Sequence, residues 1–170
     1  MSVALSTAIL VLIILLLIMI SAFFSSAETA LTAASEARIR QLAKTKASRQ
    51  AMRVEKLRKN KEELITTILV GNNLVNILAS ALATSAAISL TGDGGVALAT
   101  LVMTVIIVLF AEVLPKSYAF NNADRFSLKI ALFVQIIVWA LKPVTWSLRV
   151  IVIRLLRDKD EEGTSREDEL

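Results

Sequence analysis

Cysteine and histidine are both absent from the 170 residues of the sequence. Without them the chain has no His-centred catalytic triad, no thiolate nucleophile, no His- or Cys-based zinc site and no usual ligands for haem or an iron–sulfur cluster. It also lacks a disulfide framework from which a redox compartment can be inferred. A membrane serine hydrolase would have only a carboxylate to activate a hydroxyl such as that of Ser25, so we expect that the protein is not an enzyme.

Charge is also absent from a long N-terminal stretch, because residues 1–27 include no charged side chain. Hydrophobic residues make up 55% of the chain and the mean hydropathy is +0.66, which indicates a membrane protein. The aliphatic residues 7–24 are ~27 Å long as a helix, close to the hydrocarbon thickness of a bilayer. They have no basic segment before them and no small-residue cleavage site, so they predict a retained membrane span and not a signal peptide.

Three membrane spans are predicted, over about residues 7–31, 64–90 and 96–118. The basic segment of residues 38–61 lies between the first two spans and carries ten Lys and Arg residues. Such a segment stays in the cytoplasm, where it sets topology or touches lipid headgroups more often than it binds nucleic acid. Residues 91–95 form a Gly-rich turn without Lys or Arg and are predicted to lie outside. We therefore expect the N-terminus outside and the C-terminus in the cytoplasm.

The region after the third span predicts helices at the membrane surface and not a fourth span. Residues 130–141 are apolar but would be only ~18 Å long as a helix, and Lys142-Pro143 is expected to end that helix. A fourth crossing would carry Lys142 and Arg149 through lipid, so about residues 126–157 are predicted to form interfacial helices. The predicted fold class is an all-α membrane protein with three transmembrane helices and additional helices on the cytoplasmic side.

Polar residues occur inside each predicted span, where a central charge costs about 2.5 to 3.5 kcal/mol and so needs an explanation. Counted from the basic flanks, these residues all lie in the cytoplasmic half of the membrane and can meet at one depth. Those of the first span recur at i, i+4 and i+7, which places them on one helical face. The set comprises Ser21, Ser25 and Glu28 in the first span, Gly71, Asn72, Asn73 and Asn76 in the second, and Glu112 in the third.

This convergence of hydroxyl, amide and carboxylate oxygens predicts a site for a hard cation such as Mg²⁺. Pro115 is expected to leave a backbone oxygen free. Proline has no N–H to donate to the carbonyl four residues back, which is that of Ala111, beside Glu112. Gly71 is expected to weaken the second helix and to expose backbone oxygen beside the asparagines. Broken helices that coordinate cations recur in transporters.

Each polar residue also has a simpler structural explanation. Serine in a membrane helix commonly bonds its own i−4 carbonyl, and asparagine often joins neighbouring helices. Glu28 is a candidate partner for Arg38 or Lys116, and Lys116 also follows Glu112 at the i+4 spacing of an ion pair. The combination of carboxylate, amides and hydroxyls favours the cation site over these alternatives.

Small residues form a stripe on the second span: Ala79, Ala83, Ala86 and Ala87, with Ser80 and Thr84. Such a stripe lets helices approach closely, so it predicts packing either within the bundle or across a dimer. Three spans are few to enclose an ion path, which favours a homodimer.

Three motifs carry a family resemblance: residues 21–30 (SAFFSSAETA), 71–76 (GNNLVN) and 111–116 (AEVLPK). In order and spacing they resemble the transmembrane domain of the CorB/CorC/CNNM family of magnesium transport proteins, and the likeness covers nearly the whole chain. The resemblance implies a homodimer of three-span subunits in the inner (plasma) membrane, with a helical belt at the cytoplasmic face. It further implies that Mg²⁺ binds between the spans and is exported, in exchange for Na⁺, by alternating access.

The resemblance also implies roles for individual residues and a missing region. The implied ion ligands are Ser21, Ser25, Asn73, Asn76 and Glu112, with backbone oxygen near Gly71. Glu28 and Pro115 match motif positions without an assigned role. Family members usually continue into a cytosolic pair of CBS domains that bind ATP; residues 158–170 have the composition of a linker, and no ATP site is expected here. The alternative function is a non-transporting membrane module that senses Mg²⁺ or regulates a partner channel.

Overall fold

The protein is described by a computed structural model that covers residues 3–45 and 48–167, all of which are helical or lie in short connections, without a strand. The all-α prediction is therefore confirmed for these residues. The helices are α1 (Val3–Ala33), α2 (Glu36–Thr45), α3 (Arg49–Lys59), α4 (Lys61–Thr91), α5 (Gly95–Ile106), α6 (Leu114–Asn121) and α7 (Ala123–Glu167). A π-helical segment, η2 (Ile107–Val113), joins α5 to α6 without a break.

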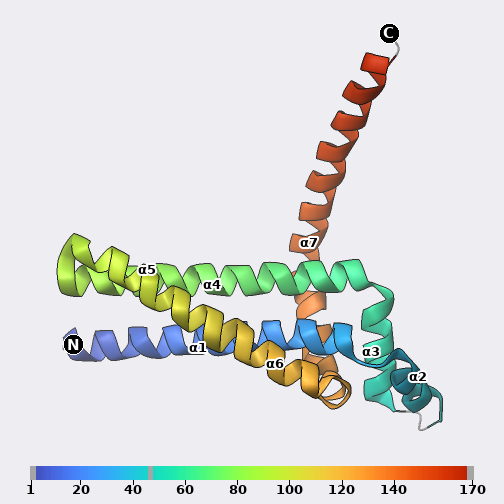
Figure 1. Cartoon of the computed structure of the whole chain (residues 1–170), viewed down its shortest axis with the longest axis horizontal. Helices are drawn as coiled ribbons and strands as arrows, with labels where there is room; N and C mark the ends of the chain where they lie inside the picture. Colours follow the sequence, from blue (N-terminus) through green and yellow to red (C-terminus); the bar gives the residue numbers. More distant parts are fainter. Residues whose placement is uncertain (1–2, 46–47, 168–170) are drawn as a thin grey trace.

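Three long helical rods run in roughly the same direction and a fourth crosses them (Figure 1). Helices α1 and α4 lie side by side, while the rod made of α5, η2 and α6 passes obliquely over α1 (Figure 1). Helix α1 is central, because it packs against α4, η2, α6 and α7. Helix α7 extends across the direction of the other rods, at the end of the molecule where α2 and α3 lie (Figure 1).

Four helical stretches are long and apolar enough to cross a membrane: Thr7–Ala33, Lys61–Thr91, Gly95–Asn121 and Ala123–Ile151. The first three coincide with the predicted spans. The fourth contains the segment that was predicted to lie at the membrane surface, so length and composition give one more candidate span than the sequence analysis did. The basic segment between the first two spans forms α2 and α3, which were not predicted individually.

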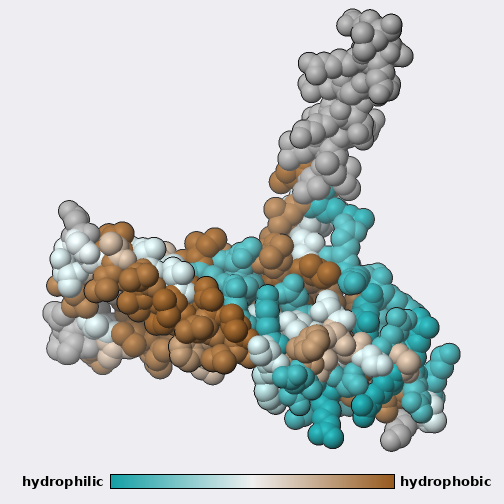
Figure 2. Space-filling model, in the orientation of Figure 1, coloured by the Kyte–Doolittle hydropathy of each residue, from teal (hydrophilic) through white to brown (hydrophobic). Residues whose placement is uncertain are grey.

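The surface is divided along the length of the rods (Figure 2). Hydrophobic side chains cover the part formed by α1, α4 and α5, whereas hydrophilic side chains surround the α2 and α3 end (Figure 2). Large apolar side chains on the hydrophobic part are exposed; for example, Leu12 is 67% and Leu101 is 65% exposed. A bilayer would cover this surface, since soluble proteins rarely expose apolar patches of such extent.

The largest fully buried apolar side chains lie at the hydrophilic end, although the core extends along α1 and α4 as far as Phe24 and Val75. Leu31 of α1, Ile39 of α2, Val54 of α3 and Val134 of α7 have at most 2% exposure each. Arg58 joins α3 to α1, because its Nη1 donates to the carbonyl oxygen of Ala34, just beyond the end of α1, at 2.8 Å. The C-terminal end of α1 is thus held in a base that it shares with α2, α3 and α7.

The Gly-rich turn forms as predicted, as a short 3-10 turn, η1 (Gly92–Gly94), between α4 and α5. Gly92 has a φ of 70°, a left-handed conformation that favours glycine. Gly95 is buried against the Thr91 hydroxyl and the Ala87 carbonyl, and a Cβ there would overlap both. These two glycines let the second and third rods reverse direction within a few residues.

Lys142-Pro143 does not end a helix, and that prediction was wrong. Helix α7 continues through Pro143, although the proline removes one backbone donor. The Thr145 hydroxyl donates to the Leu141 and Lys142 carbonyls at 3.3 and 3.1 Å, whereas the carbonyl that loses its backbone donor is that of Trp139, four residues before the proline. Pro143 is also exposed, so its ring meets no packed neighbour.

Candidate cation site

The first two motifs meet at the interface of α1 and α4. Ser21 and Ser25 of α1 are completely buried, with 0% exposure each. The Ser21 hydroxyl donates to Oδ1 of Asn72 on α4 across 2.7 Å. Two residues separated by 51 positions in the chain are therefore joined directly, as the predicted convergence requires.

Two buried oxygens on these two helices have no hydrogen-bond partner within the described part of the chain: Oγ of Ser25 and Oδ1 of Asn76, one turn to either side of the Ser21–Asn72 contact. An unpaired buried polar group costs ~1–3 kcal/mol, so nearly all such groups in proteins find a partner. Serine was expected, as the simpler explanation, to bond its own i−4 carbonyl. Ser26 does so, donating to Ala22 at 2.7 Å, but Ser25 does not.

Gly71 does not break α4, which runs without interruption from Lys61 to Thr91, so the prediction of a weakened helix was wrong there. Gly71 is instead buried against the ring of Phe24 on α1. A Cβ at position 71 would lie 2.6 Å from Cζ of Phe24, which is too close for any atom. The glycine thus permits the close approach of α1 and α4, and Phe24 is a contributor that the sequence analysis missed.

The third motif lies on the π-helical segment η2 and not on a broken helix. The Leu114 N–H donates to the Leu109 carbonyl, five residues back, and Pro115 has no N–H to give to the Ala111 carbonyl. Pro115 therefore follows closely on a widened helical segment, within one turn of the carbonyl that was predicted to be free. Segments of this kind are frequent at functional sites, and this one packs against α1.

The two carboxylates of the predicted set differ in whether they form an ion pair. Nζ of Lys116 lies 3.6 Å from Oε2 of Glu28, so Glu28 has one of its two expected partners, while Arg38 pairs with Asp124 at 3.2 Å. Glu112, which stands at i−4 from Lys116, has neither an ion pair nor a side-chain hydrogen bond in the described residues. It is half-buried on η2 and is the carboxylate left without a partner.

Asn73 is exposed on α4, so a single chain does not bury it with the other polar residues of the predicted set. In the described part of the chain, no three His, Cys, Asp or Glu side chains come together as a metal site, at this interface or away from it. A cation bound at this interface would therefore be held by hydroxyl, amide and backbone oxygens around one carboxylate, Glu112. That donor set suits Mg²⁺ or Na⁺ and not a transition metal.

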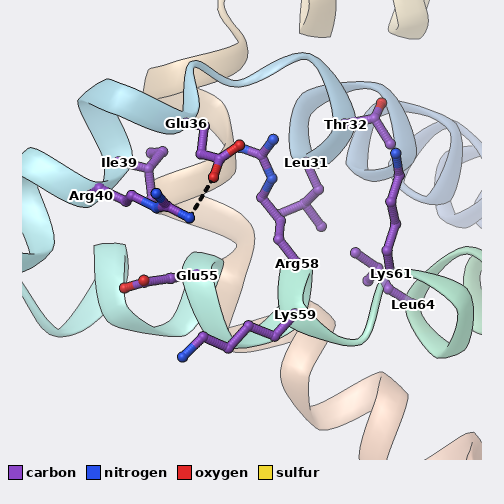
Figure 3. Close-up of a pocket in the computed structure, with 10 residues that line it drawn as sticks. All are labelled: Leu31, Thr32, Glu36, Ile39, Arg40, Glu55, Arg58, Lys59, Lys61 and Leu64. Atoms are coloured by element: carbon purple, nitrogen blue, oxygen red, sulfur yellow. Dashed lines mark ion pairs between the residues drawn. The ribbon is translucent and has the colours of Figure 1, made fainter.

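A separate cavity of about 340 Å³ lies at the base, between the ends of α1 and α4 and helices α2 and α3 (Figure 3). It is lined by Leu31, Thr32, Glu36, Ile39, Arg40, Glu55, Arg58, Lys59, Lys61 and Leu64. Three of its six charged side chains are bound within the base, since Arg40 pairs with Glu36 at 2.7 Å and Arg58 donates to the Ala34 carbonyl. None of the three motifs lines this cavity, so it is separate from the candidate cation site.

These features define a multi-pass, all-helical membrane domain with a polar interface between its long helices. The chain belongs to the cyclin M transmembrane N-terminal domain family, which matches residues 12–170. Among its relatives is the inner membrane protein YfjD of Escherichia coli, 42% identical over 81% of this chain. A protein of Haemophilus influenzae is 35% identical over 92% of the chain, and a chloroplastic DUF21 domain-containing protein of Arabidopsis thaliana is 37% identical over 89%.

Membership in this family confirms the resemblance that the three motifs indicated. The chain spans only 32%, 36% and 23% of the length of these three relatives, respectively. What is established is thus a membrane-embedded, multi-pass domain of the cyclin M type.

Proposed function

We propose that this domain is a Mg²⁺ transporter that binds the cation between α1, α4 and η2. One observation carries the proposal: Oγ of Ser25 and Oδ1 of Asn76 are buried without partners in the same helix interface to which the family motifs map. The family is associated with Mg²⁺ transport. In the antiparallel pair of α1 and α4, Ser25 and Asn76 lie on opposite sides of the Ser21–Asn72 contact, so a cation that moves along the interface would give each unpaired oxygen a partner in turn.

The chemistry of Mg²⁺ fits one carboxylate with several neutral oxygens. Mg²⁺ demands nearly octahedral coordination and dehydrates reluctantly, so it commonly keeps several waters and takes one or two carboxylates. Glu112 would neutralise part of the charge, and neutral oxygens of the interface, such as that of Ser25, would replace part of the hydration shell. Export coupled to Na⁺ by alternating access follows if Na⁺ stabilises one access state over the other.

The proposed topology has three spans, with α7 at the cytoplasmic surface. Its support lies in two ion pairs between α7 and the first turn of α4: Lys142 with Glu63 at 4.0 Å, and Arg149 with Glu62 at 3.8 Å. These contacts support a position for Lys142 and Arg149 at the level where α4 begins, outside the hydrocarbon. The crossing direction of α7 in Figure 1 agrees with a helix in the membrane plane. The basic α2 and α3 then face the cytoplasm, and the N-terminus lies outside.

A homodimer is part of the proposal, because one chain leaves Asn73 and the neighbouring Leu74 and Ile77 of α4 exposed. A second copy against this face would place Asn73 near the ion path. The other partners proposed are the bilayer and, in the full-length protein, a cytosolic CBS pair; no nucleic acid, ATP site or enzymatic activity is proposed for this domain.

The test is ion flux through the purified chain in liposomes loaded with a Mg²⁺-sensitive dye, with an imposed Na⁺ gradient. Glu112→Gln should abolish the flux, because it removes the charge that compensates the cation. Glu36→Gln is the matched control, since Glu36 is exposed on α2 and bound to Arg40, and it should transport like the parent. Absence of Glu112-dependent flux in the parent protein would overturn the transporter proposal.

The alternative, a membrane module that senses Mg²⁺ without moving it, predicts the same binding site and no flux. Calorimetric titration of the detergent-purified chain with Mg²⁺ therefore accompanies the flux assay. Binding that Glu112→Gln removes, together with no flux in the parent, would favour the sensor.

A further inference from the structure

A second polar feature lies beyond the candidate cation site, between α4 and α5. Ser80 and Thr84 belong to the small-residue stripe that predicts helix packing, but they line a cavity of about 230 Å³. The other lining residues are Thr100, Met103, Thr104, Ile107 and Val108 of the third rod. We call this cavity the hydroxyl groove.

The hydroxyls of this groove do not join the two helices. Thr100 and Thr104 donate to carbonyls of their own helix, those of Val96 at 2.9 Å and Thr100 at 2.7 Å. Ser80 and Thr84 have no hydrogen bond within the described residues, and their oxygens are not among the buried atoms. Interhelical hydrogen bonding, the usual role of hydroxyls in membrane helices, is therefore not what these side chains provide.

The walls of the groove belong to the same helical rods that carry the candidate cation site. On α4, Asn72, Asn76, Ser80 and Thr84 recur every fourth residue, so they form a stripe that rises ~6 Å and turns ~40° around the helix at each step. The opposite wall ends at Ile107 and Val108, the first two residues of η2, which also carries Glu112. This polar stripe leads toward the Gly-rich turn from Asn76, whose buried Oδ1 has no partner among the described residues.

We propose that the hydroxyl groove is the water-filled outer part of the ion path, through which hydrated Mg²⁺ moves between the candidate site and the side of the Gly-rich turn. This inference rests on the proposed transport function and names its second access route. Neutral hydroxyls suit the task, because they hydrogen-bond the waters that Mg²⁺ retains without adding a charge that would trap the ion. A cavity of 230 Å³ has room for several waters.

The absence of cysteine from the sequence makes single-cysteine labelling a direct test. Ser80→Cys, Thr84→Cys and Thr104→Cys place a thiol in the groove, while Leu98→Cys and Leu101→Cys place one on the open apolar face of α5, where the side chains are 62% and 65% exposed. The chain in liposomes is treated from outside with a charged, membrane-impermeant methanethiosulfonate. The groove cysteines should react about tenfold faster than the two controls, since only a hydrated thiol forms the reactive thiolate.

Two results would overturn the inference. Equal, slow labelling of groove and control positions would mean that lipid fills the groove. Spontaneous disulfide-linked dimers at Ser80→Cys or Thr84→Cys, with no labelling, would mean that a second copy fills it. Folding of each variant is monitored by its elution in size-exclusion chromatography. Thr84→Val keeps the shape of the side chain and removes its hydroxyl. In a normally eluting protein, this substitution should slow Mg²⁺ flux several-fold.

The labelling result and the transport result are independent of each other. Labelled groove cysteines in a protein without Glu112-dependent flux would support the hydrated groove and overturn the transporter proposal. Glu112-dependent flux with unreactive groove cysteines would overturn the groove and leave the transporter. Labelling at Thr84→Cys that also blocks flux supports both.

Discussion

The hydroxyl of Ser21 donates its hydrogen to Oδ1 of Asn72 across 2.7 Å, between helices α1 and α4. A hydroxyl has one hydrogen and two lone pairs, so this donation leaves the lone pairs of Ser21 directed elsewhere and available to a cation. Asn72 was included among the predicted metal ligands. The geometry instead favours Asn72 as a positioning residue that orients Ser21, since its own Oδ1 is already engaged.

A double-mutant cycle tests this relationship. Asn72→Ala should weaken Mg²⁺ binding when Ser21 is present and have little further effect in the Ser21→Ala background, because Asn72 acts through the serine. The coupling energy expected for two residues in direct contact is about 0.5–3 kcal/mol. Mg²⁺ affinity is measured by calorimetric titration of the four proteins. Strictly additive losses would show that Asn72 binds the cation independently.

Ser25 offers a second prediction, because its buried hydroxyl has no partner among the described residues. Ser25→Ala should weaken Mg²⁺ binding while leaving the thermal unfolding temperature in Mg²⁺-free buffer unchanged or slightly higher, since no protein hydrogen bond is lost and a desolvated group is removed. Affinity is measured by titration and unfolding by intrinsic tryptophan fluorescence.

Ser26→Ala is the matched control, because the neighbouring Ser26 already donates to the Ala22 carbonyl at 2.7 Å. It should leave Mg²⁺ affinity as in the parent. If Ser25→Ala destabilised the metal-free protein and left affinity intact, the hydroxyl would be a structural group with an unseen partner.

The contact between Gly71 and Phe24 leads to a third prediction. Gly71→Ala adds a Cβ that would lie 2.6 Å from Cζ of Phe24, so the ring must shift and α1 must move away from α4. Overpacking of this kind costs ~1–3 kcal/mol. We expect a lower unfolding temperature and weaker Mg²⁺ binding, because the Ser21–Asn72 contact is on the next residue of α4.

Phe24→Leu in the Gly71→Ala background should restore part of both losses by making room for the methyl group. Gly94→Ala controls for the general effect of replacing glycine, since a Cβ there meets no atom within 4 Å. Equal losses at Gly71 and Gly94 would contradict the packing explanation.

The sequence was sufficient for features that depend on periodicity and composition. The three long rods follow from uninterrupted apolar runs, the turn from residues 91–95, and the common depth of the polar residues from their distance to the basic flanks. These properties are local or set by the bilayer, so they can be inferred without knowing which side chains touch.

Features that depend on pairing between distant residues could not be predicted in the same way. Lys116 had two carboxylates within reach, Glu28 and Glu112, and only the packing of α6 against α1 selects Glu28. Gly71 was expected to weaken α4, but its neighbour Phe24 fills the space that the glycine leaves. Pro143 was expected to end a helix, yet it lies on an open surface and α7 continues through it.

Pro115 gives the last prediction, because the π-helical widening of η2 occurs where the proline supplies no N–H. Pro115→Ala restores that donor, so the Ala111 carbonyl can accept an ordinary i−4 bond and η2 can tighten into an α-helix. Tightening rotates Glu112 relative to α1, and Mg²⁺ affinity should fall although total helicity by circular dichroism stays the same or rises. Pro143→Ala is the control, since Pro143 is exposed on α7 and its helix is already regular. A Pro115→Ala protein that binds Mg²⁺ as tightly as the Pro143→Ala protein would show that the π segment does not position the carboxylate.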